Sequence, residues 1–508
     1  MEQLFKMSPP ENEKPRIAII TLIQEGVVKV GGEHAMLFPY VEQAIKAAET
    51  VKDKIEVIPY VISPRPKKLE KLPRVEDLRA KLIATNNGAI ILVSNGASGP
   101  YANPWNWEKF GHEAHKAILR LIREDNLQGI VVIAHGFASI PAVLNLIPSK
   151  NRGLLGKTKM VCYAITHSTF DEHKDDRPQR RLLEREISRH AGMIAISPYM
   201  ASHLEEIAMV ERKEKTIPLY NALPESGWFS NKVSESVILQ LIEERNNQLN
   251  KGPFYGTKLP IDEILAGEKE LVLYFGRAQK YVKGTDAVIA CAKQDKKRHY
   301  LLICSGSNDE LVWHKTLIKN LKNVTLAWEH NSQLVLGIVQ LTEGREKMRI
   351  TTLFLSRREP MGLVSREVIL MQKEGSVLPV VADNCGFADP WQEEFSFLVT
   401  NPRTGEENQN ISFTKLAQQG EELFISPQCI KETLAALDII SHLSTDELRK
   451  RVKGYAAKIR ENYSQDRYWA FYLQTLIETN QELEKYITAK LSEYKLQKLP
   501  NIHNVNES

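Results

Sequence analysis

Cysteine is scarce in this sequence of 508 residues, and none of its five cysteines is part of a C-x-x-C pair. Because most of them fall in apolar runs, we expect small core residues in a reducing setting: Cys162, Cys291, Cys304, Cys385 and Cys429. The first ten residues lack the apolar core of a signal peptide, and no apolar run is long enough to span a bilayer. These absences predict a cytoplasmic protein without a transmembrane segment.

A strong charge of one sign is also missing, since 67 basic and 63 acidic residues leave a formal net charge of +4. Without a basic excess or a Lys/Arg run with interleaved aromatic residues, we expect no nucleic-acid partner. No Asp-x-Asp triplet is present to bind a metal ion on a diphosphate, so we expect no metal ion. We also expect no cofactor. Apolar residues make up 43% of the chain, which is enough for the cores of two or three domains.

The most informative stretch runs from Ser356 to Glu367. An apolar run, Ile350–Leu355, precedes it and is typical of a buried parallel strand. A turn with proline and glycine follows, and then an apolar helical pattern begins. A helix start of this kind has backbone N–H groups and the positive end of the helix dipole, which together suit a phosphate. Seven residues separate the carboxylates Glu359 and Glu367 around this turn.

This stretch, Glu-Pro-x-Gly-Leu-Val-x-x-Glu, resembles the E-x7-E motif of retaining nucleotide-sugar glycosyltransferases. The nearest resemblance is to glycosyltransferase family four (glycosyl transferases group one). Taken alone, Glu359 reads equally well as a loop carboxylate and Glu367 as a solvated helix residue; about six motifs in the family's order, over roughly residues 15–480, favour the family. The resemblance implies an α/β protein of the GT-B fold. Such a protein has two facing Rossmann-like domains, a deep interdomain cleft and a C-terminal helix that crosses back.

In the N-terminal half, the glycine pair Gly31–Gly32 follows the first apolar run, Pro15–Leu22, and precedes a helical pattern. Glycines let the backbone approach a diphosphate closely, and this pair resembles the family's GG loop. Further apolar runs recur at the spacing of a doubly wound sheet. His135 follows the run Gly129–Ala134 and resembles the family's histidine that contacts the donor sugar. In the loop around Tyr101, Trp105 and Trp107, we prefer packing to stacking on a sugar.

In the C-terminal half, the apolar run Glu270–Gly276 is followed at once by Arg277 and six residues later by Lys283. Two cations at one sheet edge suit phosphate groups. They match the family's F-G-R…K-G-x-D pattern, whose residues hold the donor's diphosphate. The resemblance implies His135, Glu359, Arg277 and Lys283 as catalytic residues. The residues that it implies for nucleotide-sugar binding are Gly31, Gly32, Gly276, Arg277, Lys283, Met361, Gly362, Leu363, Val364 and Glu367, with Glu367 on the ribose.

Trp328, Glu329 and His330 are candidates near the nucleobase by the same resemblance. The sequence departs from the family's pattern at two places. Ala222 follows Asn221 where a glycine is usual, and Cys385-Gly386-Phe387 stands where the family often has a glycine pair.

We expect the following organisation: an N-terminal tail (1–14), an acceptor domain (15–224), a connection (225–267), a donor domain (268–445), C-terminal helices that pack back on the first domain (446–495) and a tail (496–508). The predicted function is the transfer of a hexose-type sugar from a nucleotide diphosphate sugar to an acceptor hydroxyl, without a metal ion. The acceptor is open: a saccharide, small molecule, lipid or protein. Two alternatives remain, another GT-B enzyme (a nucleotide-sugar 2-epimerase or a starch-synthase-like enzyme) and a non-catalytic binding protein on this scaffold.

Overall fold

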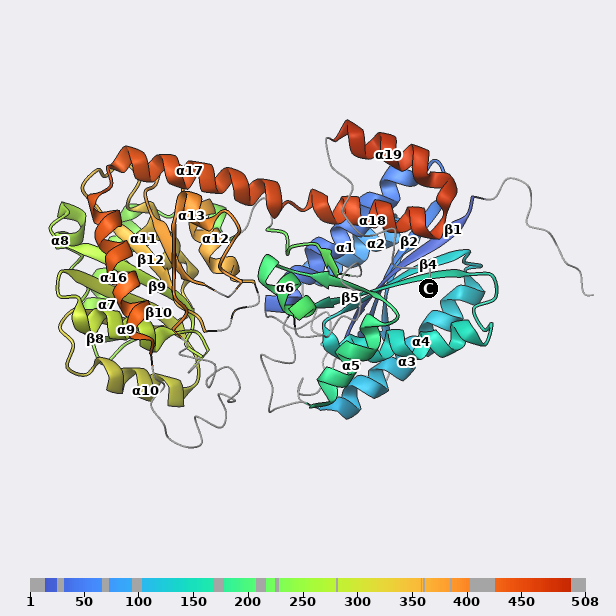
Figure 1. The fold of residues 1–508 in the computed structure, drawn as a ribbon, viewed down its shortest axis with the longest axis horizontal. Helices are drawn as coiled ribbons and strands as arrows, with labels where there is room; N and C mark the ends of the chain where they lie inside the picture. The colour runs from blue at the N-terminus through green and yellow to red at the C-terminus, as the bar shows by residue number, and fades with distance from the viewer. Residues whose placement is uncertain are drawn as a thin grey trace, which may run out of the picture. The chain divides into compact units, whose positions relative to one another are not determined.

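The structure is a computed structural model in which the chain forms two compact units. It describes residues 14–24, 32–65, 73–93, 103–167, 178–206, 216–223, 228–279, 282–357, 359, 361–383, 386–402 and 425–494. Unit 1 comprises residues 1–196, 201–222 and 465–508, and unit 2 comprises residues 197–200 and 223–464. Each unit contains one sheet covered by helices (Figure 1).

The sheet of unit 1 has seven parallel strands in the order β3-β2-β1-β4-β5-β6-β7. Its central strand β1 has the sequence RIAIITLI, and all its residues after the first are buried. Apolar residues on both faces are what a parallel strand between two helix layers requires. The strands are β1 (Arg16–Ile23), β2 (Glu56–Pro64), β3 (Ala89–Val93), β4 (Gly129–His135), β5 (Lys159–Thr166), β6 (Gly192–Ala195) and β7 (Thr216–Pro218).

Helices cover both faces of this sheet, with α3, α4 and α5 on one side and α1, α2 and α18 on the other (Figure 1). One part of the core fills the space between α1, α2 and the sheet, with Leu37, Val61 and Leu78 fully buried. The helices of unit 1 are α1 (Gly32–Val51), α2 (Pro73–Ala84), α3 (Pro104–Glu124), α4 (Ile140–Asn151), α5 (Pro178–Ser188), α18 (Asp466–Thr479) and α19 (Glu484–Glu493), with most of α6 (Pro198–Glu206).

The sheet of unit 2 has the order β14-β13-β12-β9-β10-β11-β8, and all its pairs are parallel except β11 with β8. The antiparallel strand β8 lies in the stretch 225–267, which the sequence suggested as a connection. The strands are β8 (Phe254–Gly256), β9 (Glu270–Arg277), β10 (Arg298–Ser305), β11 (Val324–Trp328), β12 (Ile350–Phe354), β13 (Leu378–Ala382) and β14 (Phe397–Val399).

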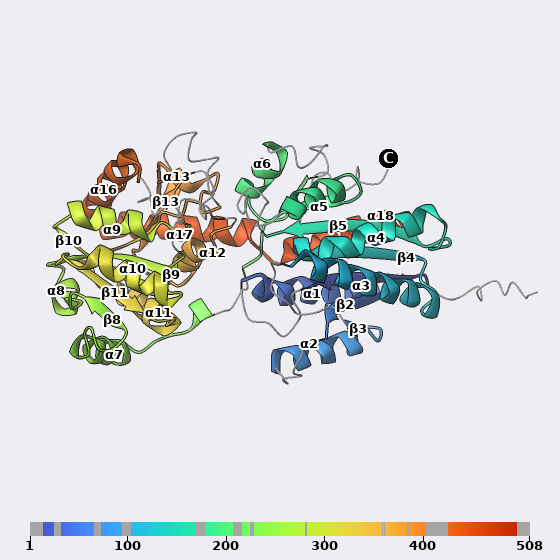
Figure 2. The ribbon, with the colours of Figure 1, turned by 90° about the horizontal axis from the view of Figure 1, so that it is seen from below.

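Among the helices of unit 2, α9 packs against α16, and α12 packs against α17 (Figure 2). The sequence grouped residues 446–495 as helices packing on the first domain. In the structure α17 belongs to unit 2, whereas α18 and α19 pack in unit 1. The helices are α7 (Glu235–Asn247), α8 (Ile261–Ala266), α9 (Thr285–Gln294), α10 (Asn308–Ile318), α11 (Ser332–Gln340), α12 (Leu363–Leu370), α13 (Gln392–Phe395), α16 (Pro427–His442) and α17 (Thr445–Asn462).

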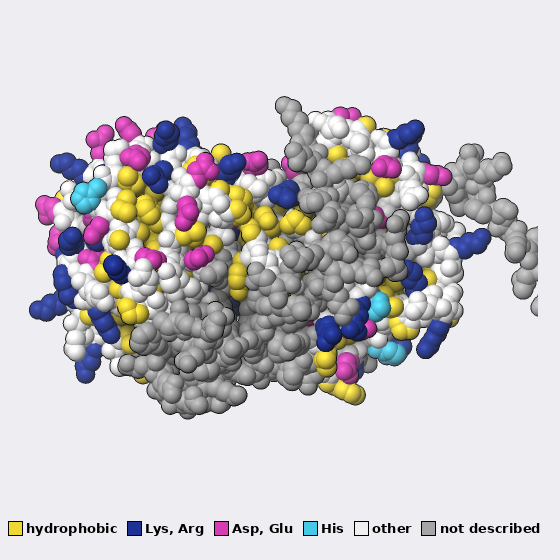
Figure 3. Space-filling model, viewed as in Figure 1, with side chains coloured by type: hydrophobic (Ala, Val, Ile, Leu, Met, Phe, Trp, Pro, Cys, Tyr) yellow, Lys and Arg dark blue, Asp and Glu magenta, His cyan; other side chains and the backbone are white. Residues whose placement is uncertain are grey.

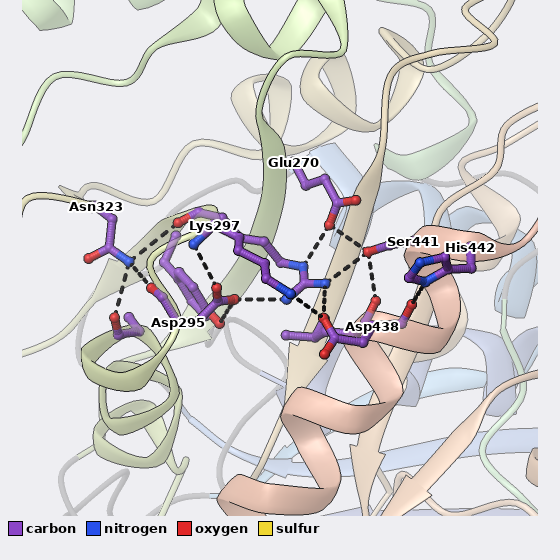
Figure 4. A network of polar contacts seen from close by, with 11 residues as sticks. Glu270, Asp295, Lys297, Asn323, Asp438, Ser441 and His442 are labelled. Atoms are coloured by element: carbon purple, nitrogen blue, oxygen red, sulfur yellow. Dashed lines mark hydrogen bonds and ion pairs between the residues drawn. The ribbon is translucent and has the colours of Figure 1, made fainter.

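A polar network that includes Glu270, Asp438 and Ser441 joins α16 to the amino ends of β9 and β10 (Figure 4). Arg298 begins β10 and donates to Glu270 at 2.6 Å, to Asp295 at 3.0 Å and to Asp438 of α16 at 2.7 Å. Ser441 joins the same network by donating to Glu270 at 2.6 Å. In open parallel sheets, ligands bind at the carboxyl ends of the strands, so a network at the amino ends serves stability.

On the face that Figure 3 shows, basic and acidic side chains are interspersed among the described residues. This mixture agrees with the formal net charge of +4. No helix in the described part of the chain has the length and apolarity that crossing a membrane requires.

Candidate functional site

The candidate residues of unit 2 follow strands at the point where the strand order reverses. The chain builds β9, β10 and β11 toward one edge and then returns to place β12 on the other side of β9. At such a switch point the connections leave neighbouring strands in opposite directions, and ligands bind at the carboxyl ends. Arg277 ends β9, and Glu359 follows β12, so these two residues lie at the same edge of the sheet.

Lys283 and Glu359 form an ion pair at this edge. The Lys283 Nζ contacts Glu359 Oε2, and the side chains are only 14% and 15% exposed. Tyr274 lies beneath, with its hydroxyl donating to the Arg277 carbonyl at 3.1 Å. Burial raises the pKa of Tyr274, the charge of Glu359 raises it further, and the charge of Arg277 lowers it. Glu359 and Arg277 therefore both influence the pKa of Tyr274, and the Arg277 residue is exposed to solvent.

Glycine is required at the start of α9, because the helix begins against the end of β12. Gly284 has a φ of 66°, and a Cβ on it would lie 1.7 Å from the carbonyl oxygen of Leu355. The backbone N–H of Arg357 donates to the Val282 carbonyl at 2.9 Å, which joins the two loops. This close approach brings Lys283 to the loop that carries Glu359.

A second glycine starts α12. Gly362 has a φ of 66°, and its missing Cβ leaves room for Phe387, whose Cδ1 would otherwise lie 2.1 Å away. Phe387 stacks on Phe354 at the end of β12, with ring centroids 5.2 Å apart. Phe387 therefore fills the space between Gly362 and the end of β12.

Around this helix start, the remaining candidates have mixed exposure. Met361 is buried, Leu363 and Val364 are half-buried, and Glu367 is half-buried one turn into α12. Gly276, near the end of β9, has a φ of 143° that favours glycine. A glycine with positive φ thus lies near the end of β9 and another at the start of α12, the helix that follows the neighbouring strand β12.

Two buried arginines hold these loops, and sequence reasoning missed both. Arg357 donates to both carboxylate oxygens of Asp286, at 2.8 and 2.6 Å. Arg366 donates to Asp389 at 2.7 Å and to the carbonyls of Met361 and Gly362 at the start of α12. Both arginine side chains are at most 1% exposed. The sequence signal was one arginine just before the E-x7-E stretch and one within it, a pattern that solvated side chains explain equally well.

In unit 1, His135 is the last residue of β4, beside the central strand β1. It is buried and lies edge-to-face against Tyr40, with ring centroids 5.1 Å apart. The ring of His167, just past the end of β5, lies 4.5 Å from it, and burial lowers the pKa of His167 to about 3. Gly32 begins α1, which follows β1, whereas Gly31 lies outside the described residues.

A chain of hydroxyl groups behind His135 was not predicted. The Tyr40 hydroxyl donates to Asn221 at 2.6 Å and lies 2.5 Å from the hydroxyl of Tyr468. Tyr468 belongs to α18, so these hydroxyls join α18 to α1 close to His135. Ala222, the residue after Asn221, is completely buried.

The aromatic residues near the start of α3 divide between packing and exposure. Trp107 is buried and packs edge-to-face on Phe137, with centroids 4.9 Å apart, as the sequence favoured. Trp105 is 69% exposed, and Tyr101 lies outside the described residues.

The three candidates near a nucleobase lie at and just past the end of β11. Glu329 accepts a hydrogen bond from Arg245 of α7 at 3.3 Å. Trp328 lies beside His314, with ring centroids 5.6 Å apart, and His330 follows on the surface. Arg245 therefore neutralises the Glu329 carboxylate.

No protein-family model and no curated protein matches the sequence. Solved structures match most of the chain at low identity. An Escherichia coli protein bound with UDP-2-fluoro glucose has a TM-score of 0.56 at 12% identity, and the match covers 90% of this chain and 98% of that one. An Anabaena protein, HepE, in complex with UDP has a TM-score of 0.53 at 14% identity, with 92% and 100% covered. A glycosyltransferase from Rickettsia africae has a TM-score of 0.51 at 14% identity, with 92% and 98% covered.

These matches extend over both sheets and their helices, and they confirm the fold class that the sequence suggested. The chain has the GT-B fold, with two α/β units built on largely parallel sheets. At identities this low, the likeness concerns the fold, and function has to be argued from the site.

Proposed function

We propose that this protein is a glycosyltransferase that moves a hexose-type sugar from a nucleotide diphosphate sugar to an acceptor hydroxyl. The observation that carries the proposal is the cluster at the switch point of unit 2. There Lys283 pairs with Glu359 a few residues before the glycine-capped start of α12, and Arg277 ends the neighbouring strand β9 at the same edge of the sheet. Two cations and a helix start suit a diphosphate, and a neighbouring carboxylate suits sugar hydroxyls.

In the proposed reaction, the bond between the anomeric carbon and the diphosphate oxygen breaks, and its electron pair leaves with the diphosphate. The acceptor oxygen forms the new bond to that carbon, and its proton passes to the leaving phosphate oxygen. Arg277, Lys283 and the start of α12 would stabilise the negative charge that grows on the diphosphate. Glu367 would accept hydrogen bonds from the ribose hydroxyls.

We propose that Glu359 and His135 contact the sugar. Glu359 follows β12, and His135 is the last residue of β4. The backbone of the Gly31–Gly32 loop would add amide donors to the diphosphate. The E-x7-E resemblance supports retention of the anomeric configuration, and the lack of an Asp-x-Asp triplet supports independence from a metal ion. We place donor binding mainly in unit 2, acceptor binding mainly in unit 1 and the reaction in the cytoplasm.

A ligand screen tests the first part of the proposal. UDP, GDP, ADP and their glucose derivatives are added to the protein, and its melting temperature is followed, because a ligand that binds only the folded state raises it. We expect at least one nucleotide sugar to raise the melting temperature. Release of nucleotide is then measured with and without candidate acceptors, and the sugar product is identified. A changed sugar without an acceptor would indicate an epimerase instead.

Substitutions test the residue roles. Arg277→Ala and Lys283→Ala should each lower the transfer rate by roughly 10²-fold or more, as loss of one charged stabilising group does. Arg345→Ala is the matched control, because it removes a cation of unit 2 that pairs with Glu235 at 2.6 Å, outside the cluster. Transfer at the wild-type rate by both cluster variants would contradict the assignment of the diphosphate site.

A further inference from the structure

The ion pair between Lys283 and Glu359 has a consequence for ligand binding. Resting on the proposed function, we infer that Glu359 competes with the donor's diphosphate for Lys283. Glu359 would pair with Lys283 when the site is empty and would turn to the sugar hydroxyls when a nucleotide sugar is bound. Its return to Lys283 after transfer would weaken the hold on the nucleotide diphosphate product.

Glu359 is the carboxylate that pairs with the Lys283 ammonium. Asp286 is close by, but both its oxygens accept hydrogen bonds from Arg357, and that pair is almost fully buried. Arg277 extends to solvent from the end of β9. Lys283 and Glu359 therefore form the one pair of this group that is partly accessible, with 14% and 15% of the side chains exposed.

Electrostatics make the competition necessary. An ammonium has three donors and could touch both a carboxylate and a phosphate. However, placing both anions on it would bring like charges within about 5–6 Å of each other in a partly desolvated site, where their repulsion is poorly screened. A bound diphosphate therefore weakens the contact between Glu359 and Lys283. A sugar hydroxyl next to the diphosphate can then donate to the released carboxylate.

Replacing Glu359 with glutamine tests whether Glu359 competes for Lys283 or only binds the sugar. Glu359→Gln keeps the shape and removes the charge, which leaves a mostly buried ammonium without its anion. A nucleotide diphosphate would restore the missing negative charge. We therefore expect the variant to bind UDP, GDP or ADP about 3–10-fold more tightly than the wild type does, because the repulsion between the Glu359 carboxylate and the diphosphate is lost.

The sugar should have the opposite effect. In the wild type, the sugar hydroxyls of a nucleotide sugar gain the carboxylate as an acceptor, whereas in Glu359→Gln they meet an amide. The ratio of the dissociation constants of the nucleotide diphosphate and its sugar derivative should therefore fall in the variant. Transfer should slow, and inhibition by the nucleotide diphosphate product should become stronger.

The test is a double-mutant cycle on full-length protein, with UDP, GDP and ADP titrated calorimetrically into wild type, Glu359→Gln, Lys283→Met and the double variant. We expect tighter binding for Glu359→Gln, weaker binding for Lys283→Met and no gain from Glu359→Gln once Lys283 is replaced. Glu235→Gln is the control, since it removes a carboxylate that is paired with Arg345 away from the site. That variant should bind as the wild type does.

Three outcomes would overturn the inference, and they can be told apart. Wild type that binds a nucleotide diphosphate while Glu359→Gln binds it equally or more weakly would refute the competition but leave the proposed function standing. An equal gain with and without Lys283 would indicate general repulsion instead of competition for the ammonium. If none of the four proteins binds any of the three nucleotides, the proposed function fails and the inference fails with it.

Discussion

A single methyl group at Gly284 should disturb both the stability of unit 2 and the proposed diphosphate site. In Gly284→Ala, the new Cβ would meet the Leu355 carbonyl oxygen at 1.7 Å. This obstacle is backbone at the end of β12, so no side chain can turn away to make room. The left-handed backbone costs an alanine about 1–2 kcal/mol. The overlap should add roughly 1–3 kcal/mol, as overpacking does.

The matched control is Gly344→Ala. Gly344 has a φ of 77°, close to the 66° of Gly284, and a Cβ there would meet no atom within 4 Å. Its substitution should cost only the backbone contribution of about 1–2 kcal/mol. The difference between the two variants therefore isolates the close approach of α9 to the end of β12.

Hydrogen exchange resolved by peptide is the suitable assay, because a chain with two units need not unfold in one step. Amides of α9 and β12 should exchange much faster in Gly284→Ala than in Gly344→Ala, while peptides of unit 1 exchange as in the wild type. Displacement of Lys283 should also weaken binding of nucleotide diphosphates in Gly284→Ala alone. Equal exchange in the two glycine variants would refute the close approach.

Three further predictions concern residues behind the site. Arg357→Met leaves the buried Asp286 without its partner and should lower the free energy of unfolding by about 3–5 kcal/mol; an unchanged urea midpoint would contradict this. Tyr468→Phe removes a hydroxyl that lies 2.5 Å from the Tyr40 hydroxyl and donates to the Leu219 carbonyl at 3.2 Å, so it should cost about 1 kcal/mol in thermal unfolding; an unchanged unfolding free energy would contradict both contacts. The pKa of His167 is lowered by burial to about 3, so the unfolded chain binds a proton that the folded chain does not. Stability from this group is therefore complete above about pH 6.5 and falls as the pH drops toward 3; His167→Gln should flatten that part of a stability–pH curve.

Much of the fold could be predicted from local sequence because both sheets are built from short apolar runs. Strands such as β1 and β12 are buried on both faces, so a run of apolar residues marks them without reference to the rest of the chain. The three-residue strand β8 gave no such signal, since it lies between Gly252 and Pro260 and pairs antiparallel at the sheet edge. The charged pattern of α17 predicted a helix but could not tell which unit it packs on.

The buried polar contacts around the candidate residues could not be predicted, for a different reason. Arg357 and Asp286 are 71 residues apart, and Tyr40 and Tyr468 are 428 apart. A charged or hydroxyl side chain has the same appearance in a sequence whether it faces water or a distant partner. Only the close approach of the start of α9 to the end of β12, and the packing of α18 against α1, bring these groups together as buried, bonded pairs.

The candidate site of unit 2 has two kinds of ion pair, fully buried and partly exposed, and we infer different roles for them. Arg357–Asp286 and Arg366–Asp389 are excluded from water and bonded through several donors, so opening either would leave a charge uncompensated. They can hold the loops but cannot exchange partners. Lys283–Glu359 is a single contact that water reaches in part, so an incoming anion can replace the carboxylate. A rigid frame with one exchangeable pair is what a site needs if it is to grip a diphosphate during transfer and let it go afterwards.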